Sequence, residues 1–246
     1  MNILKKGIGH FLISLLTGDG MQFVRHPLNR NDRIGMLNKC WGYIFTNQVK
    51  GAYYEFGIHG GESFINSWKA YQILRRWRKA QEASTEEWRR KSVGDYASYN
   101  HDFYGFDTFE GMPKNNEKSI TFAPGTFISS LEEVDNRCTK AGMKFKLFKG
   151  LFAEINDDIL RGLPPAAIIN IDSDLYTSAN DALKKIKDKF QQGTILLMDD
   201  YNCFNADNNK GERRALKEFS EKNKYIDFES WFSYQYVGQA FICHIL

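Results

Sequence analysis

Residues 165–201, PAAIINIDSDLYTSANDALKKIKDKFQQGTILLMDDY, decide the fold of this chain. Residues 166–171 form a short apolar run, and residues 194–198 form a second one. Between them, residues 175–190 carry apolar or small side chains at helical spacing. Two hydrophobic strands joined by a helix make a βαβ unit, which is typical of a parallel sheet covered on both faces. This stretch therefore predicts an α/β fold.

Both predicted strands end in acidic residues. Asp172 and Asp174 follow the first strand, and Asp199 and Asp200 follow the second. Ligands of such sheets bind beyond the carboxyl ends of the strands, so we expect the four carboxylates to meet at one edge. Carboxylates this close repel one another unless protons or a cation neutralise them. The pattern indicates a bound metal ion, although Asp199 and Asp200 could instead cap the turn that follows.

A glycine-rich turn between a strand and a helix precedes this unit. A strand is predicted over residues 52–56, the turn carries Gly57, Gly60 and Gly61, and a long helix follows Ser63. Glycines in such a turn let a ligand approach the backbone and leave helix N–H groups free to bind it. Their spacing differs from the GxGxxG pattern of dinucleotide enzymes, and an ordinary tight turn explains them equally well.

A further acidic strand end follows after an insertion. Residues 103–106 predict a strand that leads to Asp107, where an acid can accept both hydroxyls of a ribose. Residues 75–101 interleave Arg and Lys with Glu, which favours a solvated helical insertion over a basic patch for an acidic acceptor. The remaining expected elements are a helix over 125–141 with Thr126 as its N-cap, a strand over 144–148, and closing strands over 231–236 and 239–245.

Length and composition restrict the class of protein. The chain has 246 residues, 15% aromatic residues and a net charge of +3, which suit one large α/β domain and indicate no nucleic-acid partner. Its four cysteines are far apart in sequence, which favours a reducing compartment, hence a cytoplasmic location, over a disulfide or zinc protein.

The N-terminal segment is the least regular part of the sequence. An apolar stretch within residues 1–20 is too short to be a transmembrane segment, and an amphipathic helix packed on the domain explains it better than a secretory signal. Residues 1–50 contain no strand pattern, so we expect a helical cap there and a sheet domain over 51–246 with a helical insertion at about 75–101. Aromatic residues in the cap and the insertion could form the interface of a homo-oligomer.

Six blocks of the sequence together resemble the macrocin O-methyltransferase family. They lie within about residues 33–219 and read EFGIHGGES, FYGFDTFEGMP, KGLFAEI, IDSDLYTS, GTILLMDDY and GERRALKEF. Members of this family are metal-dependent S-adenosylmethionine enzymes that methylate hydroxyl groups, typically of sugars on natural products. The resemblance implies a Rossmann-like class I methyltransferase fold, with a mostly parallel sheet, an antiparallel last strand and helices on both faces.

The resemblance also implies roles for individual residues. Asp172, Asp199 and Asp200 would hold a magnesium ion (Mg2+), and Asp174 would be the general base, although it could equally be a partner that orients a metal ligand. The S-adenosyl-L-methionine site would be lined by residues of the glycine turn and the strand ends, namely Glu55, Gly57, Gly61, Ser63, Asp107 and Asp172. The acceptor would be a small molecule with a hydroxyl, as in a sugar, but the N-terminal segment matches the family poorly, so the identity of the acceptor does not carry over.

Three other functions compete with methyl transfer. The strongest is a metal-dependent glycosyltransferase, because Asp172-Ser173-Asp174 also fits a DxD nucleotide-sugar motif. That motif leaves the glycine turn, Asp107 and the second acid pair unexplained. A complete acid cluster argues against a non-catalytic adenosylmethionine-binding regulator, and the glycine spacing argues against a dinucleotide oxidoreductase. The sequence therefore favours an O-methyltransferase.

Overall fold

The computed structural model describes residues 31–115 and 121–246. Within these residues, seven strands form one sheet in the order β3-β2-β1-β4-β5-β7-β6. Strands β1 to β5 are parallel, whereas β7 pairs antiparallel with both β5 and β6. This confirms the predicted α/β class and the antiparallel last strand. The strands are β1 Ala52–Phe56, β2 Phe103–Asp107, β3 Phe145–Lys149, β4 Ala166–Ile171, β5 Ile195–Met198, β6 Ile226–Tyr234 and β7 Gly238–Ile245.

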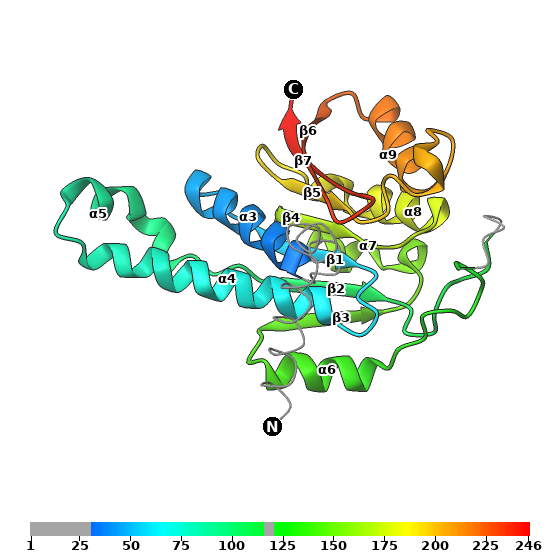
Figure 1. Cartoon of the computed structure of the whole chain (residues 1–246), viewed down its shortest axis with the longest axis horizontal. Coiled ribbons are helices and arrows are strands. Elements are labelled where there is room, and N and C mark those ends of the chain that lie inside the picture. The colour runs from blue at the N-terminus through cyan, green and yellow to red at the C-terminus, as the bar shows by residue number, and fades with distance from the viewer. Residues whose placement is uncertain (1–30, 116–120) are drawn as a thin grey trace, which may run out of the picture.

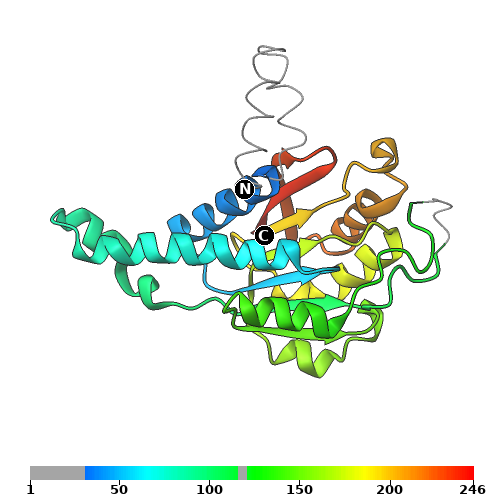
Figure 2. The same cartoon turned by 60° about the horizontal axis from the view of Figure 1, so that its bottom comes forward.

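Helices cover both faces of the sheet (Figure 1 and Figure 2). One face packs against α3 (Asn31–Asn47), α4 (Glu62–Ala80) and α6 (Leu131–Lys140). The other packs against α7 (Asp157–Arg161), α8 (Tyr176–Ile186) and α9 (Gly211–Lys222). Because neighbouring side chains of a strand point to opposite faces, Tyr53 of β1 belongs to the first core and Tyr54 to the second.

Helix α3 is an integral part of the first core. Leu37, Cys40 and Trp41 are fully buried, and the Trp41 indole donates a hydrogen bond to the Ser67 hydroxyl of α4 at 3.0 Å. A fully buried apolar side chain contributes roughly 1.5–3 kcal/mol to stability, so α3 is firmly anchored. The predicted amphipathic helix within residues 1–20 lies outside the described residues, and the division into a cap over 1–50 and a domain over 51–246 stays a prediction.

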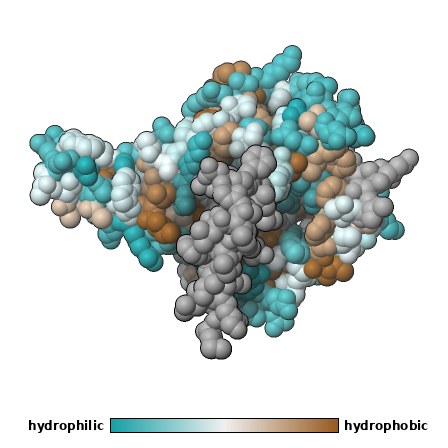
Figure 3. Space-filling model, viewed as in Figure 1, coloured by the Kyte–Doolittle hydropathy of each residue, from teal (hydrophilic) through white to brown (hydrophobic). Residues whose placement is uncertain are grey.

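The outer half of α4 extends beyond the sheet and, with η1 (Gln81–Ala83), α5 (Glu87–Val93) and η2 (Gly94–Ser98), forms an arm over residues 73–98 (Figure 1). The apolar side chains of α4 are buried only at its base. Phe64 and Tyr71 are buried, whereas Ile73 and Trp77 expose 61% and 57% of their surface. Figure 3 shows the arm as largely hydrophilic, with hydrophobic surface gathered along α4.

The start of α6 differs from the sequence-based expectation. The predicted helix over residues 125–141 begins only after Ser130, whose hydroxyl accepts a hydrogen bond from the Glu133 N–H and caps the helix in place of Thr126. Positive φ angles of 80° at Gly125 and 60° at Phe127 exclude a right-handed helix before that point. These residues instead form a loop that reaches the cavity described below.

Strand β6 also begins earlier than predicted, at residue 226 rather than 231. Its pairing with β7 shifts register between Ser230 and Phe232. A bulge of this kind breaks the alternation of inward and outward side chains, which is why the sequence pattern missed the first half of the strand.

The four cysteines, Cys40, Cys138, Cys203 and Cys243, are free thiols. Of the helices in the described part of the chain, none combines the length and apolar character required to cross a bilayer.

Candidate active site

A cavity of about 460 Å³ lies at the carboxyl ends of the parallel strands. Its walls come from the glycine turn after β1, the loop after β2 and the acidic loops after β4 and β5, so it contains both Asp107 and Asp200. The strand order reverses between β1 and β4, and ligands of open α/β sheets bind beside such a reversal. The cavity therefore occupies the edge that the sequence predicts.

The glycine turn packs backbone to backbone against the first acidic loop. Gly57 has a φ of 90°, and a Cβ added to it would lie 1.9 Å from the carbonyl oxygen of Asp172. Its N–H donates to the Phe106 carbonyl at 2.8 Å. Only glycine fits this position, because any side chain would push the two loops apart.

Gly57→Ala should destabilise the protein by about 2–4 kcal/mol, since it combines backbone strain with a direct clash. Gly125→Ala is the matched control: Gly125 also has a positive φ of 80°, but nothing lies within 4 Å of its added Cβ. Strain alone should cost this variant about 1 kcal/mol. Urea unfolding measures both, and equal losses would contradict the role of the close contact.

Glu55 lies behind the cavity wall rather than in it. It is fully buried, and its carboxylate accepts hydrogen bonds from the hydroxyls of Tyr53 and Ser63. Burial raises the pKa of Glu55 to about 7, although both hydrogen bonds act in the opposite direction. Of the residues predicted to form the cofactor site at this turn, Gly57 and Ser63 line the cavity, whereas Glu55 and Gly61 do not.

Asp107 is held rigidly at the end of β2. Its Oδ2 accepts a hydrogen bond from the backbone N–H of His59 at 2.8 Å, and its Oδ1 accepts one from that of Phe109 at 2.7 Å. The first bond ties the glycine turn to β2. An ionised carboxylate has about four acceptor sites, so Asp107 can accept further hydrogen bonds from hydroxyls in the cavity.

The three predicted metal ligands converge. Asp172, Asp199 and Asp200 each offer an oxygen, and these three atoms lie within 4.8 Å of one another. Oδ1 of Asp199 is buried and has no hydrogen-bond partner among the described residues. Burial raises the pKa of both Asp172 and Asp199. A set of carboxylate oxygens with an unsatisfied buried member suits a hard divalent cation such as magnesium.

Asp174 stands beside this cluster in an unusual backbone conformation. Its φ is 60°, in the left-handed region, and its side chain lines the cavity. Burial raises the pKa of Asp174 to about 9, and the charge of Asp200 adds to the effect. A raised pKa makes Asp174 a stronger base than an ordinary aspartate once it is ionised, and the positive charge of a cation bound at the neighbouring carboxylates would favour the ionised form.

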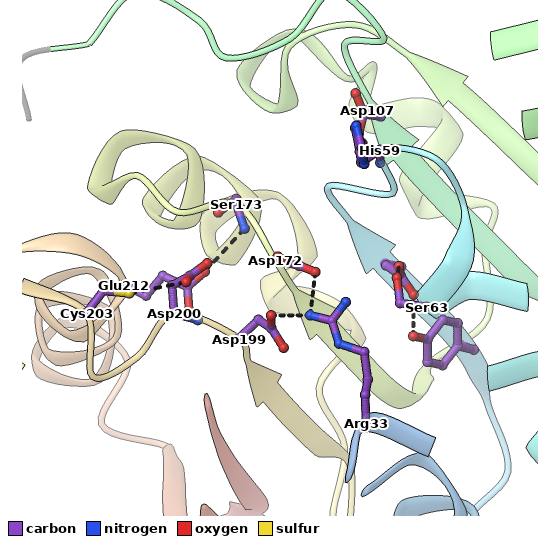
Figure 4. Close-up of polar contacts among 12 residues, drawn as sticks. Arg33, His59, Ser63, Asp107, Asp172, Ser173, Asp199, Asp200, Cys203 and Glu212 are labelled. Atoms are coloured by element: carbon purple, nitrogen blue, oxygen red, sulfur yellow. Dashed lines mark hydrogen bonds and ion pairs between the residues drawn. The ribbon is translucent and has the colours of Figure 1, made fainter. Parts of the chain in front are cut away.

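Arg33 is a site residue that the sequence did not reveal. It comes from the first turn of α3, and its Nη2 donates to Oδ2 of Asp172 at 2.9 Å and to Oδ2 of Asp199 (Figure 4). Burial lowers the pKa of the guanidinium, but the two carboxylates outweigh it and hold the pKa above its ordinary value. The partners lie 139 and 166 positions away in the chain, so no local motif could have indicated the contact.

Glu212, in the first turn of α9, joins the two acidic loops. It is fully buried, and its two carboxylate oxygens accept hydrogen bonds from the N–H of Ser173 at 3.3 Å and the N–H of Asp200 at 3.1 Å (Figure 4). In the sequence analysis, Glu212 appears only as part of the block GERRALKEF, and no role is predicted for it. An acid in a first helical turn is ordinarily explained by the helix dipole, so its role here could not be predicted.

The strand order, the antiparallel β7 and the position of the cavity define a class I methyltransferase fold. The chain is similar in structure to the O-methyltransferase NovP, with a TM-score of 0.61 and 18% identity over 86% of this chain and 79% of NovP. It is also similar to the calicheamicin methyltransferase CalS11, with a TM-score of 0.59 and 16% identity over 94% of this chain and 85% of CalS11.

The family model of the macrocin-O-methyltransferases (TylF) matches residues 90–232, more than half of the chain. The chain therefore belongs to this family, which confirms the resemblance seen in the sequence. A curated relative is the 8-demethyl-8-(2,3-dimethoxy-alpha-L-rhamnosyl)-tetracenomycin-C 4'-O-methyltransferase of Streptomyces olivaceus, 26% identical over 199 residues. The match covers 76% of this chain and 66% of the relative, just under two thirds of its length.

Proposed function

We propose that this protein is an O-methyltransferase that uses S-adenosylmethionine and magnesium to methylate a hydroxyl of a sugar or a sugar-containing natural product. Family membership supports the reaction class. The relative from Streptomyces olivaceus is named for methylation of a rhamnosyl product, which supports the acceptor class. Structures similar in fold were determined with SAH or with SAM, which supports the methyl donor.

One observation carries the proposal: a single cavity combines a glycine turn and a strand-end carboxylate, which would suit a nucleoside, with a cluster of carboxylate oxygens, which would suit a metal ion. The turn at Gly57 and the carboxylate of Asp107 form one part, and Asp172, Asp199 and Asp200 form the other. Methyl transfer requires donor and acceptor to be held in line, and a shared cavity provides that arrangement. A glycosyltransferase that uses Asp172 and Asp174 as a DxD motif would leave the second acid pair, Asp199 and Asp200, unexplained.

In the proposed reaction, Asp107 accepts hydrogen bonds from the ribose hydroxyls of the donor, and the backbone at Gly57 allows the donor to lie close to the sheet. Asp172, Asp199 and Asp200 would hold the metal ion. When bound, magnesium would orient the acceptor and stabilise negative charge that develops on its oxygen. Asp174 accepts the proton of the acceptor hydroxyl, and its place beside the three ligands suits this role.

Thermal unfolding with candidate ligands tests the function. A ligand that binds only the folded protein raises Tm, and the rise grows with the logarithm of the ratio of ligand concentration to Kd. S-adenosylmethionine should raise Tm, whereas a UDP-sugar and NAD should not. Transfer of a labelled methyl group from S-adenosylmethionine to rhamnosylated acceptors should follow. A rise in Tm with the UDP-sugar alone would support the glycosyltransferase instead.

Asp107→Ala should weaken adenosylmethionine binding by roughly 10- to 150-fold, because loss of a charged acceptor costs about 1.5–3 kcal/mol. Magnesium affinity should stay the same, since Asp107 is not in the acid cluster. Isothermal titration calorimetry measures both affinities. An unchanged affinity for adenosylmethionine would remove Asp107 from the cofactor site.

Glu212→Gln should weaken magnesium binding by roughly 10- to 100-fold, the usual effect of losing a group that orients metal ligands. The amide has only one acceptor oxygen for the N–H groups of Ser173 and Asp200. One of the two acidic loops therefore loses its hydrogen bond to α9. Glu218→Gln, on the same helix at a less buried position, is the control. Equal magnesium affinities in the two variants would contradict this role of Glu212.

A further inference from the structure

Arg33 approaches the acid cluster from the opposite side to Glu212 (Figure 4). Its Nη2 contacts one oxygen of Asp172 and one oxygen of Asp199, so a single nitrogen bridges two members of the three-carboxylate set. A metal ion coordinated by both carboxylates would need much of the same space. The guanidinium and the ion therefore compete for the same two side chains.

We propose that Arg33 and a divalent metal ion are alternative partners of Asp172 and Asp199, so that metal binding releases the Arg33 guanidinium from the cluster. This inference rests on the metal site of the proposed function. It assigns to the first turn of α3 a role in controlling how tightly the protein binds its metal.

Neither Arg33 nor Asp199 has all of its hydrogen-bonding atoms paired in the cluster. With Arg33 in place, Oδ1 of Asp199 and Nε of Arg33 itself are buried without a hydrogen-bond partner among the described residues. A buried polar group without a partner is costly. The ion pair therefore does not use the full bonding capacity of either residue, and a better partner can replace it.

Charge favours the exchange in the same direction. One guanidinium brings a single positive charge to a cavity that contains Asp172, Asp174, Asp199 and Asp200. A divalent ion brings two charges and can bind oxygens of three carboxylates at once, including Asp200. Arg33, in contrast, forms ion pairs with only two acids among the described residues, Asp172 and Asp199.

Release of Arg33 does not require a large rearrangement of the fold. Arg33 is only partly buried, with 24% of its side chain exposed, and it lies at the beginning of α3, where the chain enters the helix. The fully buried Leu37 and Trp41 hold the rest of the helix in the core. Exchange therefore requires movement of one side chain and the first helical turn, not displacement of α3.

Arg33→Gln tests the exchange. Removing the competing cation should tighten magnesium binding by roughly 5- to 150-fold, the range usual for two coupled ligands, while adenosylmethionine affinity stays unchanged. Arg33→Lys keeps the charge and should bind magnesium more like the wild-type protein. Arg137→Gln is the matched control, because Arg137 lines the same cavity but donates to the Gly60 carbonyl. Calorimetric titration with magnesium chloride measures all four proteins.

A second measurement uses the wild-type protein and does not depend on the folding of any variant. Phenylglyoxal modifies accessible arginines, and mass spectrometry of the peptides reports the rate at each one. Saturating magnesium should accelerate modification of Arg33 and leave Arg137 unchanged. An unchanged or slower rate at Arg33 would overturn the exchange.

The outcomes separate this inference from the proposed function. If the wild-type protein binds magnesium and Arg33→Gln binds it no more tightly, the exchange is wrong and the metal site stands. If neither protein binds magnesium, both the metal site and the exchange are wrong, while binding of adenosylmethionine would still support methyl transfer.

Discussion

Asp174→Asn is expected to lower kcat by roughly 10²–10⁴ while it leaves the affinities for magnesium and adenosylmethionine nearly unchanged. An amide has nearly the same shape as the carboxylate but cannot accept the proton of the acceptor hydroxyl. The loss should therefore fall on the chemical step. Kinetics across a magnesium titration, together with calorimetry of both ligands, measure this expectation.

The same titration separates the two roles that the sequence left open for Asp174. If Asp174 only orients a metal ligand, the substitution should weaken magnesium by roughly 10- to 100-fold, and saturating magnesium should restore much of the rate. Recovery of the wild-type kcat at high magnesium would exclude Asp174 as the base. Asp188→Asn, the same change on a side chain that is 84% exposed, controls for the substitution itself.

Removal of the metal should have the other large effect: EDTA should abolish turnover, and magnesium should restore it. Three carboxylates converge within 4.8 Å, and without the metal ion Arg33 supplies only one positive charge to them. The negative charge that remains opposes binding of an acceptor whose oxygen becomes negative. Calcium should restore less activity than magnesium, because it is larger and less demanding in geometry.

A variant of one ligand provides an independent check on the metal. Asp199→Asn keeps the size of the side chain but removes a charge from the most buried member of the cluster. It should require more magnesium than the wild-type protein for half-maximal rate. Full activity of the wild-type protein in metal-free buffer would rule out a catalytic metal and would leave Asp174 to act without one.

The sequence predicts the sheet well because the central strands are buried on both faces. Such strands appear as short continuous apolar runs, as in β4 and β5. Parallel strands carry their last residues to a common edge, so the convergence of Asp172 with Asp199 also follows from the sequence. The acid cluster could thus be predicted from strand ends alone.

Other parts of the site depend on contacts that no local pattern contains. Arg33 and Glu212 reach the acidic loops from helices at distant positions in the chain. Glu55 shows a different limit: it lies within β1 rather than beyond it, and its side chain points toward α4 and bonds to Ser63 there. Because β1 continues to Phe56, Glu55 is still held within the strand, and its side chain does not line the cavity.

The arm formed by residues 73–98 is a suitable site for inserting an engineered tag. It joins α4 to the amino end of β2, the edge of the sheet opposite to the cavity, and it extends away from the body (Figure 2). Thr85 and Glu86 are exposed at its far turn, a kind of position that tolerates insertion. A fluorescent reporter or an immobilisation tag placed there would leave the carboxyl ends of the strands, and hence the chemistry, undisturbed.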